Sequence, residues 1–346
     1  MSPRFPAAVN RARRAVEAVL DPGGLTLVGC SGGTDSLALA AAAAFHHQRA
    51  TGSMAQARVG AVVVDHQLHP RSDAVTTTAL RQLESLGLEP VISLKATVDQ
   101  DSGEGPEAAA RVARYRAFAE ALQQTGASRI LLAHTRDDQA EQVLLGLARG
   151  SGTRTLAGIP ASRGPFRRPL LELTRSETEE ICAHAGLSPW HDPANADPKY
   201  LRSKVRTEIL PYLEAQLSGS IRESLARTAQ IAAEDAAYLE AEAKACFARL
   251  LEDPGPQGQL RLDLDALQTA PPAIRRRVIA LAVVAAGGAT PSYERLGSVE
   301  KLLIKRGSAG PVELEGQVSA HRGTRGSVDY GKLVIVPRQN QGTRNF

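Results

Sequence analysis

Short, continuous apolar runs alternate with longer helical segments in the first half of the chain. The apolar runs occupy residues 25–30, 59–66, 89–98 and 129–134. The segments that follow them, with helix-forming composition or spacing, span residues 35–50, 72–87, 105–126 and 137–150. Because strands buried on both faces are continuously apolar, this alternation predicts an α/β fold with a doubly wound, Rossmann-like parallel sheet. Such sheets bind ligands at the carboxyl ends of their strands.

The pattern becomes mainly helical from about residue 210. Residues 211–252, 271–288 and 292–307 have helical spacing, whereas residues 310–337 alternate and carry glycine turns typical of short strands. Upstream, residues 176–186 predict a helix that begins with a capping box of Ser176 and Glu179. The predicted organisation is a catalytic domain over residues 1–215, a mainly helical domain over 216–308 and a short β tail over 309–346.

Composition narrows the class of protein. The 346 residues are 43% hydrophobic, which is ordinary for a globular chain, and no window of about 18 residues is apolar and free of charge, so no membrane span is expected. Cys30, Cys182 and Cys246 are widely spaced, which argues against a disulfide framework or a zinc site and predicts a cytoplasmic location. A net charge of +4 is compatible with a nucleic-acid partner without establishing one. The sequence leaves a homodimer open.

A glycine-bearing loop lies between the first apolar run and the helix that follows it. Its residues are Ser31, Gly32, Gly33, Thr34, Asp35 and Ser36. Glycines let backbone amides approach a ligand, and a helix N-terminus favours an anion, so the loop predicts a phosphate site. It lacks the Gly-Lys-Ser/Thr of the common P-loop, and Asp35 suits a phosphate only if Mg²⁺ lies between them. The alternative is a simple helix cap at Thr34 or Asp35.

The loop resembles the pyrophosphatase loop of the ATP pyrophosphatase (PP-loop) superfamily, whose members cleave ATP at the α-phosphate. Later motifs are similar to those of the tRNA(Ile)-lysidine synthase family over roughly residues 25–215. They read VVVDHQLHPRS, PEAAARVARYRAF, LLAHTRDDQAEQVLLGLARGSG, RRPLLELT and WHDPANADPKYLRSKVR. The resemblance implies an adenine nucleotide α-hydrolase type of fold. It also implies ligation of L-lysine to C2 of the wobble cytidine in the CAU-anticodon isoleucine tRNA, through an adenylated base, which changes codon reading from AUG to AUA.

Two clusters of polar residues follow the second and fourth apolar runs. Asp65 and His66 end the second run, where an ATP adenosine would lie, and a plain turn is the alternative. The second cluster comprises His134, Asp137, Asp138 and Glu141. Acidic residues also favour a helix start, so capping is the alternative there. The resemblance implies a lysine substrate, whose ammonium would fit this cluster, or a second Mg²⁺ contact. We expect Asp137 near the lysine and His134 as a positioning or proton-handling group.

Basic residues supply candidate contacts to tRNA or phosphate. These are Arg111, Arg114, Arg149, Arg202 and Arg206. Arg206 is the candidate to stabilise charge at the α-phosphate, and a solvated basic face is the alternative for this stretch. In the later helices, Arg275–Arg277, Lys305 and Arg306 are candidates to hold the tRNA backbone.

Two other functions stay open at this stage. One is a different PP-loop enzyme such as a tRNA thiolase, although sulfur transfer generally needs suitably placed cysteines. The other is a non-catalytic nucleotide-binding protein. Both predict ATP binding, but neither predicts transfer of lysine to tRNA.

Overall fold

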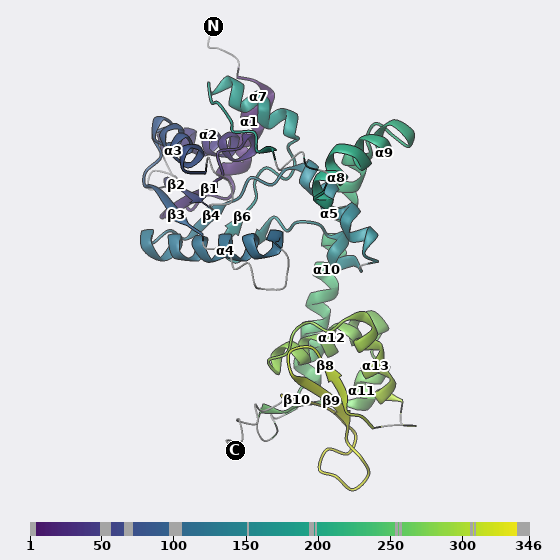
Figure 1. The fold of residues 1–346 in the computed structure, drawn as a ribbon. Helices are drawn as coiled ribbons and strands as arrows, with labels where there is room; N and C mark the ends of the chain where they lie inside the picture. Colours follow the sequence, from purple (N-terminus) through teal and green to yellow (C-terminus); the bar gives the residue numbers. More distant parts are fainter. Residues whose placement is uncertain are drawn as a thin grey trace, which may run out of the picture. The chain divides into compact units, whose positions relative to one another are not determined.

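The computed structural model describes residues 5–48, 57–65, 72–96, 106–150, 152–193, 197, 199–252, 255, 258–304, 307 and 309–337, apart from the side chains of residues 106 and 107. The chain divides into two compact units, Met1–Ala233 and Glu234–Phe346 (Figure 1). We refer to them as the N-terminal and C-terminal units. The boundaries predicted at residues 215/216 and 308/309 remain predictions. No described helix combines the length and apolar composition that crossing a membrane requires.

A six-stranded sheet organises the N-terminal unit, in the order β3-β2-β1-β4-β6-β5. Its strands are β1 (Leu25–Cys30), β2 (Arg58–Asp65), β3 (Val91–Lys95), β4 (Arg129–Leu131), β5 (Ser162–Arg163) and β6 (Phe166–Arg167). All neighbouring pairs are parallel except β5 with β6 at one edge. The predicted α/β fold with a parallel sheet is therefore confirmed.

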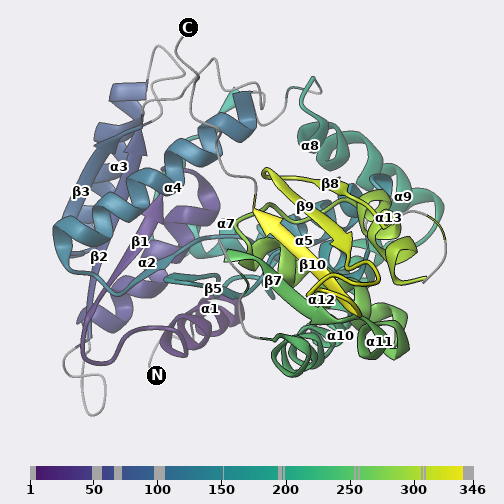
Figure 2. The same ribbon diagram turned by 90° about the horizontal axis from the view of Figure 1, so that it is seen from below.

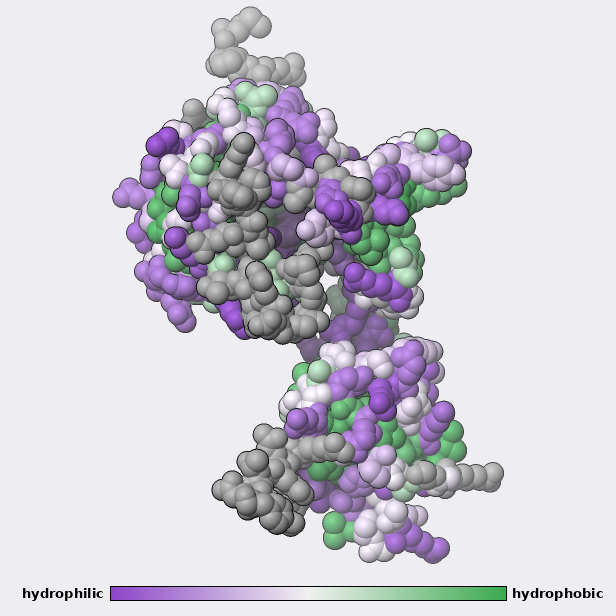
Figure 3. All heavy atoms as spheres, viewed as in Figure 1, coloured by the Kyte–Doolittle hydropathy of each residue, from purple (hydrophilic) through white to green (hydrophobic). Residues whose placement is uncertain are grey.

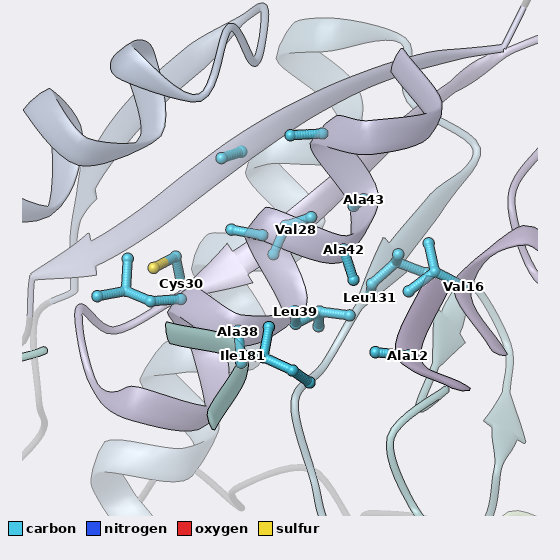
Figure 4. Packing of buried hydrophobic residues seen from close by; sticks show 14 of the residues in the cluster. Ala12, Val16, Val28, Cys30, Ala38, Leu39, Ala42, Ala43, Leu131 and Ile181 are labelled. Atoms are coloured by element: carbon cyan, nitrogen blue, oxygen red, sulfur yellow. The ribbon is translucent and has the colours of Figure 1, made fainter. Parts of the chain in front are cut away.

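Helices cover both faces of this sheet (Figures 1 and 2). One face carries α1 (Ala7–Glu17), α2 (Thr34–Gln48), α3 (Ser72–Ser85) and α7 (Arg175–His184), and the other carries α4 (Pro106–Thr125). The side chains of β1 alternate between the two cores: Val28 packs toward α2, whereas Leu27 packs toward Phe118 of α4. Figure 4 shows the first of these cores, where small alanines of α2 let helix and sheet approach closely.

Close packing also explains one glycine of β2. A Cβ atom on Gly60 would lie 2.4 Å from the backbone oxygen of Pro90, closer than side-chain carbons approach backbone oxygens. The Ala61 amide donates to that same oxygen at 2.8 Å. Gly60 therefore allows the chain entering β3 to lie directly against β2.

A further group of helices extends the N-terminal unit beyond the sheet. It comprises α5 (Arg136–Ala148), α6 (Thr153–Leu156), α8 (Leu201–Lys204), the π-helical turn η3 (Val205–Ile209) and α9 (Leu210–Gln216). Val205 and Leu210 are five residues apart, yet both are buried in one core with Ala140 of α5. In a regular α-helix they would point about 140° apart, whereas a π turn brings residues five apart onto one face.

The C-terminal unit combines helices with an antiparallel sheet. Its helices are α11 (Leu264–Thr269), α12 (Pro272–Ala285) and α13 (Tyr293–Leu303), while α10 (Ile221–Leu250) spans the unit boundary. The strands β7 (Leu260–Asp263), β8 (Val312–Leu314), β9 (Val318–Arg322) and β10 (Lys332–Pro337) pair in the order β7-β10-β9-β8. These helices and strands share one apolar core, beneath a surface that mixes hydrophilic and hydrophobic residues (Figure 3). The three tail strands match the predicted β region, whereas β7 was not predicted.

Candidate active site at the carboxyl ends of the strands

A cavity of about 770 Å³ opens at the carboxyl ends of β1, β2 and β4. It lies where the chain, after adding β2 and β3 on one side of β1, returns to add β4 on the other. The predicted ATP residues that line it are Ser31, Gly33, Thr34, Asp35, Ser36 and Asp65. Gly32 lines a smaller neighbouring cavity, and His66 lies outside the described residues. The loop and the second strand are thus brought together as predicted.

Hydrogen bonds within the loop fix its shape. The Ser36 hydroxyl donates to the Gly33 carbonyl at 2.9 Å and accepts from the Ser31 amide at 3.2 Å. Gly32 has φ = +77°, a left-handed conformation that suits glycine. Its carbonyl accepts from the Trp190 amide at 2.9 Å, which ties the loop to the segment after α7. The conformation of the loop is therefore fixed by hydrogen bonds within the loop and by the bond to Trp190.

The carboxylate of Asp35 is oriented by residues of α7. Among the described residues, it makes no hydrogen bond that caps its own helix, α2. The Thr178 hydroxyl donates to its Oδ1 at 2.5 Å, and Arg175 Nε lies 3.7 Å from its Oδ2. Burial raises the pKa of Asp35, against the effect of those two partners. Among the described residues, no group of three or more His, Cys, Asp or Glu side chains is arranged so that it could hold a metal ion. A single carboxylate fits Mg²⁺ that is held mainly by nucleotide phosphates and water, as is usual for this ion.

Three carboxylates and three guanidinium groups form one network, of which Asp35, Asp138, Arg175 and Arg206 line the cavity. We call this set the acid–arginine cluster; it comprises Asp35, Asp138, Glu141, Arg175, Arg202 and Arg206. Glu141 is fully buried and accepts from Arg202 Nε at 2.9 Å and from Arg206 Nε at 2.6 Å. Burial opposes the charge of Arg206, but the bond to Glu141 outweighs it and raises the pKa of Arg206. The alternative of a solvated basic face is therefore wrong for Arg202 and Arg206, which both pair with the buried Glu141.

Local helix structure places the two acids of α5. Thr135 is the N-cap of α5, and its amide donates to Asp138 Oδ2 at 2.8 Å in a capping box. The capping alternative is thus correct for one oxygen of Asp138, while Oδ1 lies 3.5 Å from both Arg175 and Arg206. Burial opposes its charge, but the nearby arginines hold the pKa of Asp138 below its usual value. Glu141 follows one turn later on the same face.

Asp137 points away from the cavity, toward α7 and α10. Its Oδ2 accepts from the backbone amide of Arg175 at 2.9 Å, and its Oδ1 accepts from Arg222 Nη1 at 3.1 Å. It is absent from the residues that line the cavity. A direct contact between Asp137 and lysine stays a prediction; of the three acids of α5, Asp138 lines the cavity, whereas Asp137 and Glu141 are not among the lining residues.

His134 follows β4 and lines the cavity. Burial lowers its pKa to about 4, and nearby arginines add to this against the charge of Asp138. The imidazole is therefore neutral at pH 7. Its Nδ1 is buried and has no hydrogen-bond partner among the described residues. A buried polar atom beside a cavity is a natural place for a ligand group to bind.

The other predicted basic residues of this unit are spread over several places. Arg114 lines the cavity, whereas Arg111 lies over the ring of Tyr115, 5.2 Å from its centroid. Arg149 is exposed at the end of α5 and is not among the cavity residues. In the C-terminal unit, Arg275 and Arg276 both donate to Glu300, while residues 305 and 306 lie outside the described residues.

Sequence reasoning missed Arg175, Thr178 and Trp190 at the site, and Arg222 as the partner of Asp137. The sequence did not single out Arg175, because the helix was predicted to begin at Ser176, whereas α7 begins at Arg175. A basic side chain is unfavourable at the positive end of a helix dipole and therefore suggests an acidic partner elsewhere. The cap of α7 was also misplaced: it is formed by Thr174 and Glu177, two residues before the predicted Ser176 and Glu179.

Family models match both units of the chain. The family model of the PP-loop domain matches residues 9–213, and that of the TilS substrate binding domain matches residues 262–325. A tRNA(Ile)-lysidine synthase of Leifsonia xyli subsp. xyli is 46% identical, with 86% of this chain and 87% of the relative covered. The enzyme of that name from Streptomyces coelicolor is 43% identical, with 90% and 85% covered.

A solved structure shares the fold at low identity. It is a U34-tRNA thiolase from Methanococcus maripaludis with its [4Fe-4S] cluster, and it is 18% identical with a TM-score of 0.54. The match covers 66% of this chain and 80% of the thiolase. At this identity the likeness supports the α/β architecture alone.

Proposed function

The chain belongs to the tRNA(Ile)-lysidine synthase family, and on that premise we propose that it joins L-lysine to C2 of the wobble cytidine in an isoleucine tRNA with a CAU anticodon. One observation supports the proposal: residues of the Ser31–Ser36 loop and Asp138 line the same cavity, and the fully buried Glu141 shares the arginine partners of Asp138. The loop could bind the phosphates of a nucleoside triphosphate, and the acids could bind an ammonium group.

The first step uses the loop. The cytidine O2 attacks the α-phosphorus of ATP, pyrophosphate leaves, and the base becomes an AMP ester. Amides of the loop and of the α2 N-terminus would bind phosphate oxygens, and Arg206 would stabilise the charge that develops there. Asp35 would hold Mg²⁺, which would neutralise charge on the departing pyrophosphate.

The second step uses the acids of α5. The ε-amine of lysine attacks C2, AMP leaves, and the amine loses a proton. Asp138 and Glu141 would bind the ammonium before it reacts. Free lysine titrates near 10.4, so a proton acceptor is required for attack. His134 is neutral and lines the cavity, so we assign it the positioning of the reacting groups. Its low pKa makes it a weak base, and Asp138, whose pKa the nearby arginines hold below its usual value, is no stronger one.

The C-terminal unit would bind the body of the tRNA. Its match to a substrate-binding domain covers residues 262–325, and α12 carries three successive arginines, Arg275–Arg277. Arg276 lies over the exposed ring of Tyr293, 4.9 Å from its centroid. Guanidinium groups in such positions suit RNA phosphates. A cytoplasmic location follows from this substrate as part of the same proposal.

Transfer of labelled lysine to CAU-anticodon isoleucine tRNA in the presence of ATP tests the proposal. Glu141→Gln should reduce transfer about a hundredfold or more, because a buried charge partner is lost. The matched control is Glu180→Gln, which removes the charge of an exposed glutamate of α7 and should leave transfer unchanged. No transfer by the folded, ATP-binding wild type would refute the function.

A tRNA thiolase is the alternative within the same fold. Cys30 and Cys182 lie in the core around α2, and Cys246 lies in the separate core of the C-terminal unit; all three are buried. Burial raises the pKa of Cys182 to about 12, so this thiol is a poor nucleophile. Incorporation of sulfur in place of lysine, with a sulfur donor supplied, would favour the thiolase.

A further inference from the structure

Arg175 lies at the centre of the acid–arginine cluster without a short hydrogen bond from its guanidinium group to the three acids. Its nitrogens are 3.7 Å from Asp35, 3.5 Å from Asp138 and 3.7 Å from Glu141. By contrast, Arg202 and Arg206 approach Glu141 to 2.9 and 2.6 Å. The guanidinium of Arg175 therefore occupies the space between three carboxylates, which is the space that a small cation would occupy.

Charge in the cluster is balanced as the structure stands. The three carboxylates face three guanidinium groups, so the formal sum is zero. An incoming ammonium would therefore enter a neutral cluster in which each acid already has a cation. Like charges brought together in a buried site disfavour one another. One arginine must leave before Asp138 and Glu141 can bind a further cation.

The nucleotide would supply a new partner for that arginine. Arg175 already reaches Asp35 of the phosphate-binding loop, so phosphates bound there would lie near its guanidinium group. The planar fork of arginine binds phosphate oxygens more strongly than it holds a carboxylate at 3.5 Å or beyond. The backbone of Arg175 is fixed, because its amide donates to Asp137, which Arg222 holds in turn. The side chain can thus turn while α7 stays in place.

We infer that Arg175 occupies the lysine ammonium position until a nucleotide binds, and that its movement toward the phosphates couples lysine binding to ATP binding. The inference rests on the proposed function, because it takes Asp138 and Glu141 as the lysine site. ATP binding adds anionic charge and withdraws one guanidinium from the acids. The position that the guanidinium of Arg175 leaves beside Asp138 and Glu141 is then open to the ε-ammonium of lysine. Linkage requires that lysine strengthen nucleotide binding by the same factor.

Equilibrium dialysis with labelled L-lysine tests this coupling on the full chain. The dissociation constant of lysine is measured without nucleotide and with a saturating α,β-methylene analogue of ATP plus Mg²⁺. For the wild type, we expect the analogue to tighten lysine binding about tenfold or more, within the usual range of coupling between sites. The reciprocal measurement, analogue binding with and without lysine, should give the same factor.

Substitutions assign the coupling to Arg175. Arg175→Gln should bind lysine more tightly than the wild type without nucleotide, and the coupling factor should fall below about two. Arg175→Lys keeps the charge and should retain part of the coupling. Arg81→Gln removes an exposed arginine from α3 and should keep the wild-type factor. A merely structural role of Arg175 would weaken lysine binding in both states and leave the ratio unchanged.

Each outcome separates the inference from the function beneath it. Equal lysine binding with and without the analogue, in a wild type that transfers lysine to tRNA, overturns the role of Arg175 and leaves the proposed function standing. Full coupling in Arg175→Gln also overturns it. Absence of lysine binding in both states, together with absence of transfer, refutes the proposed function itself.

Discussion

Lowering the pH from 7 to 5 should destabilise the N-terminal unit through His134. Burial lowers the pKa of this histidine from 6.5 to about 4. Between these two values the unfolded chain binds a proton that the native state does not, so stability falls as the pH falls. The contribution is fully present above the unfolded value and is lost progressively down to the native value. The whole shift is worth about 3 kcal/mol, of which about 2 kcal/mol is lost between pH 7 and pH 5.

Urea unfolding at several pH values measures this effect. Trp190 is the only tryptophan of the chain and lies in the N-terminal unit, so its fluorescence reports the unfolding of that unit. His134→Gln keeps a polar side chain but removes the titration. The loss of unfolding free energy between pH 7 and pH 5 should be about 2 kcal/mol greater in the wild type than in His134→Gln. The carboxylates common to both proteins contribute equally and cancel in this difference.

An equal dependence on pH in the two proteins would refute the reasoning. It would mean that His134 titrates alike in the native and unfolded states, and hence that water reaches the imidazole. A steeper loss in the variant would contradict the sign of the effect. Either result would also remove the argument that His134 is neutral when substrates bind.

Three further predictions concern the loop, the sheet and the C-terminal unit. Asp35→Asn should abolish tRNA-dependent pyrophosphate release but leave the urea midpoint near that of the wild type; unchanged release would remove the magnesium role of Asp35. Gly60→Ala should lower the free energy of unfolding by about 1–3 kcal/mol, because its Cβ would meet the Pro90 oxygen at 2.4 Å; a neutral effect in urea unfolding would contradict the packing described. Arg276→Gln should weaken tRNA binding and reduce the slope of log affinity against log salt by about 1 in filter-binding measurements, whereas an unchanged slope would exclude a phosphate contact.

The parallel sheet and the phosphate loop could be predicted from sequence because local patterns specify both. The apolar run of residues 25–30 is a strand buried on both faces, and the glycines of the loop follow it directly. In contrast, β5 and β6 have two residues each, too few to show any periodicity. The strand β7 is only four residues long and gains its place by pairing with β10, some seventy positions further along the chain.

The acids of the site were also predictable, but their partners were not. Asp138 and Glu141 lie one turn apart on a helix that begins after a strand, so their neighbourhood follows from local structure. The contacts of Asp137 join residues 38 and 85 positions away, and only tertiary packing determines them. The sequence could not show these contacts. Asp137 was therefore predicted as the lysine contact, whereas its side chain points toward α7 and α10.

The π turn η3 places a constraint on the length of its helix. Deleting Thr207 would convert the turn to regular α-helix and would improve the local hydrogen bonds. Every residue beyond the deletion would then rotate by about 100° relative to Arg202 and Arg206. Either Leu210 would leave its core or the two arginines would leave Glu141. A deletion that is favourable for the helix would thus be harmful to the protein, so related chains should vary in sequence within this turn more readily than in length.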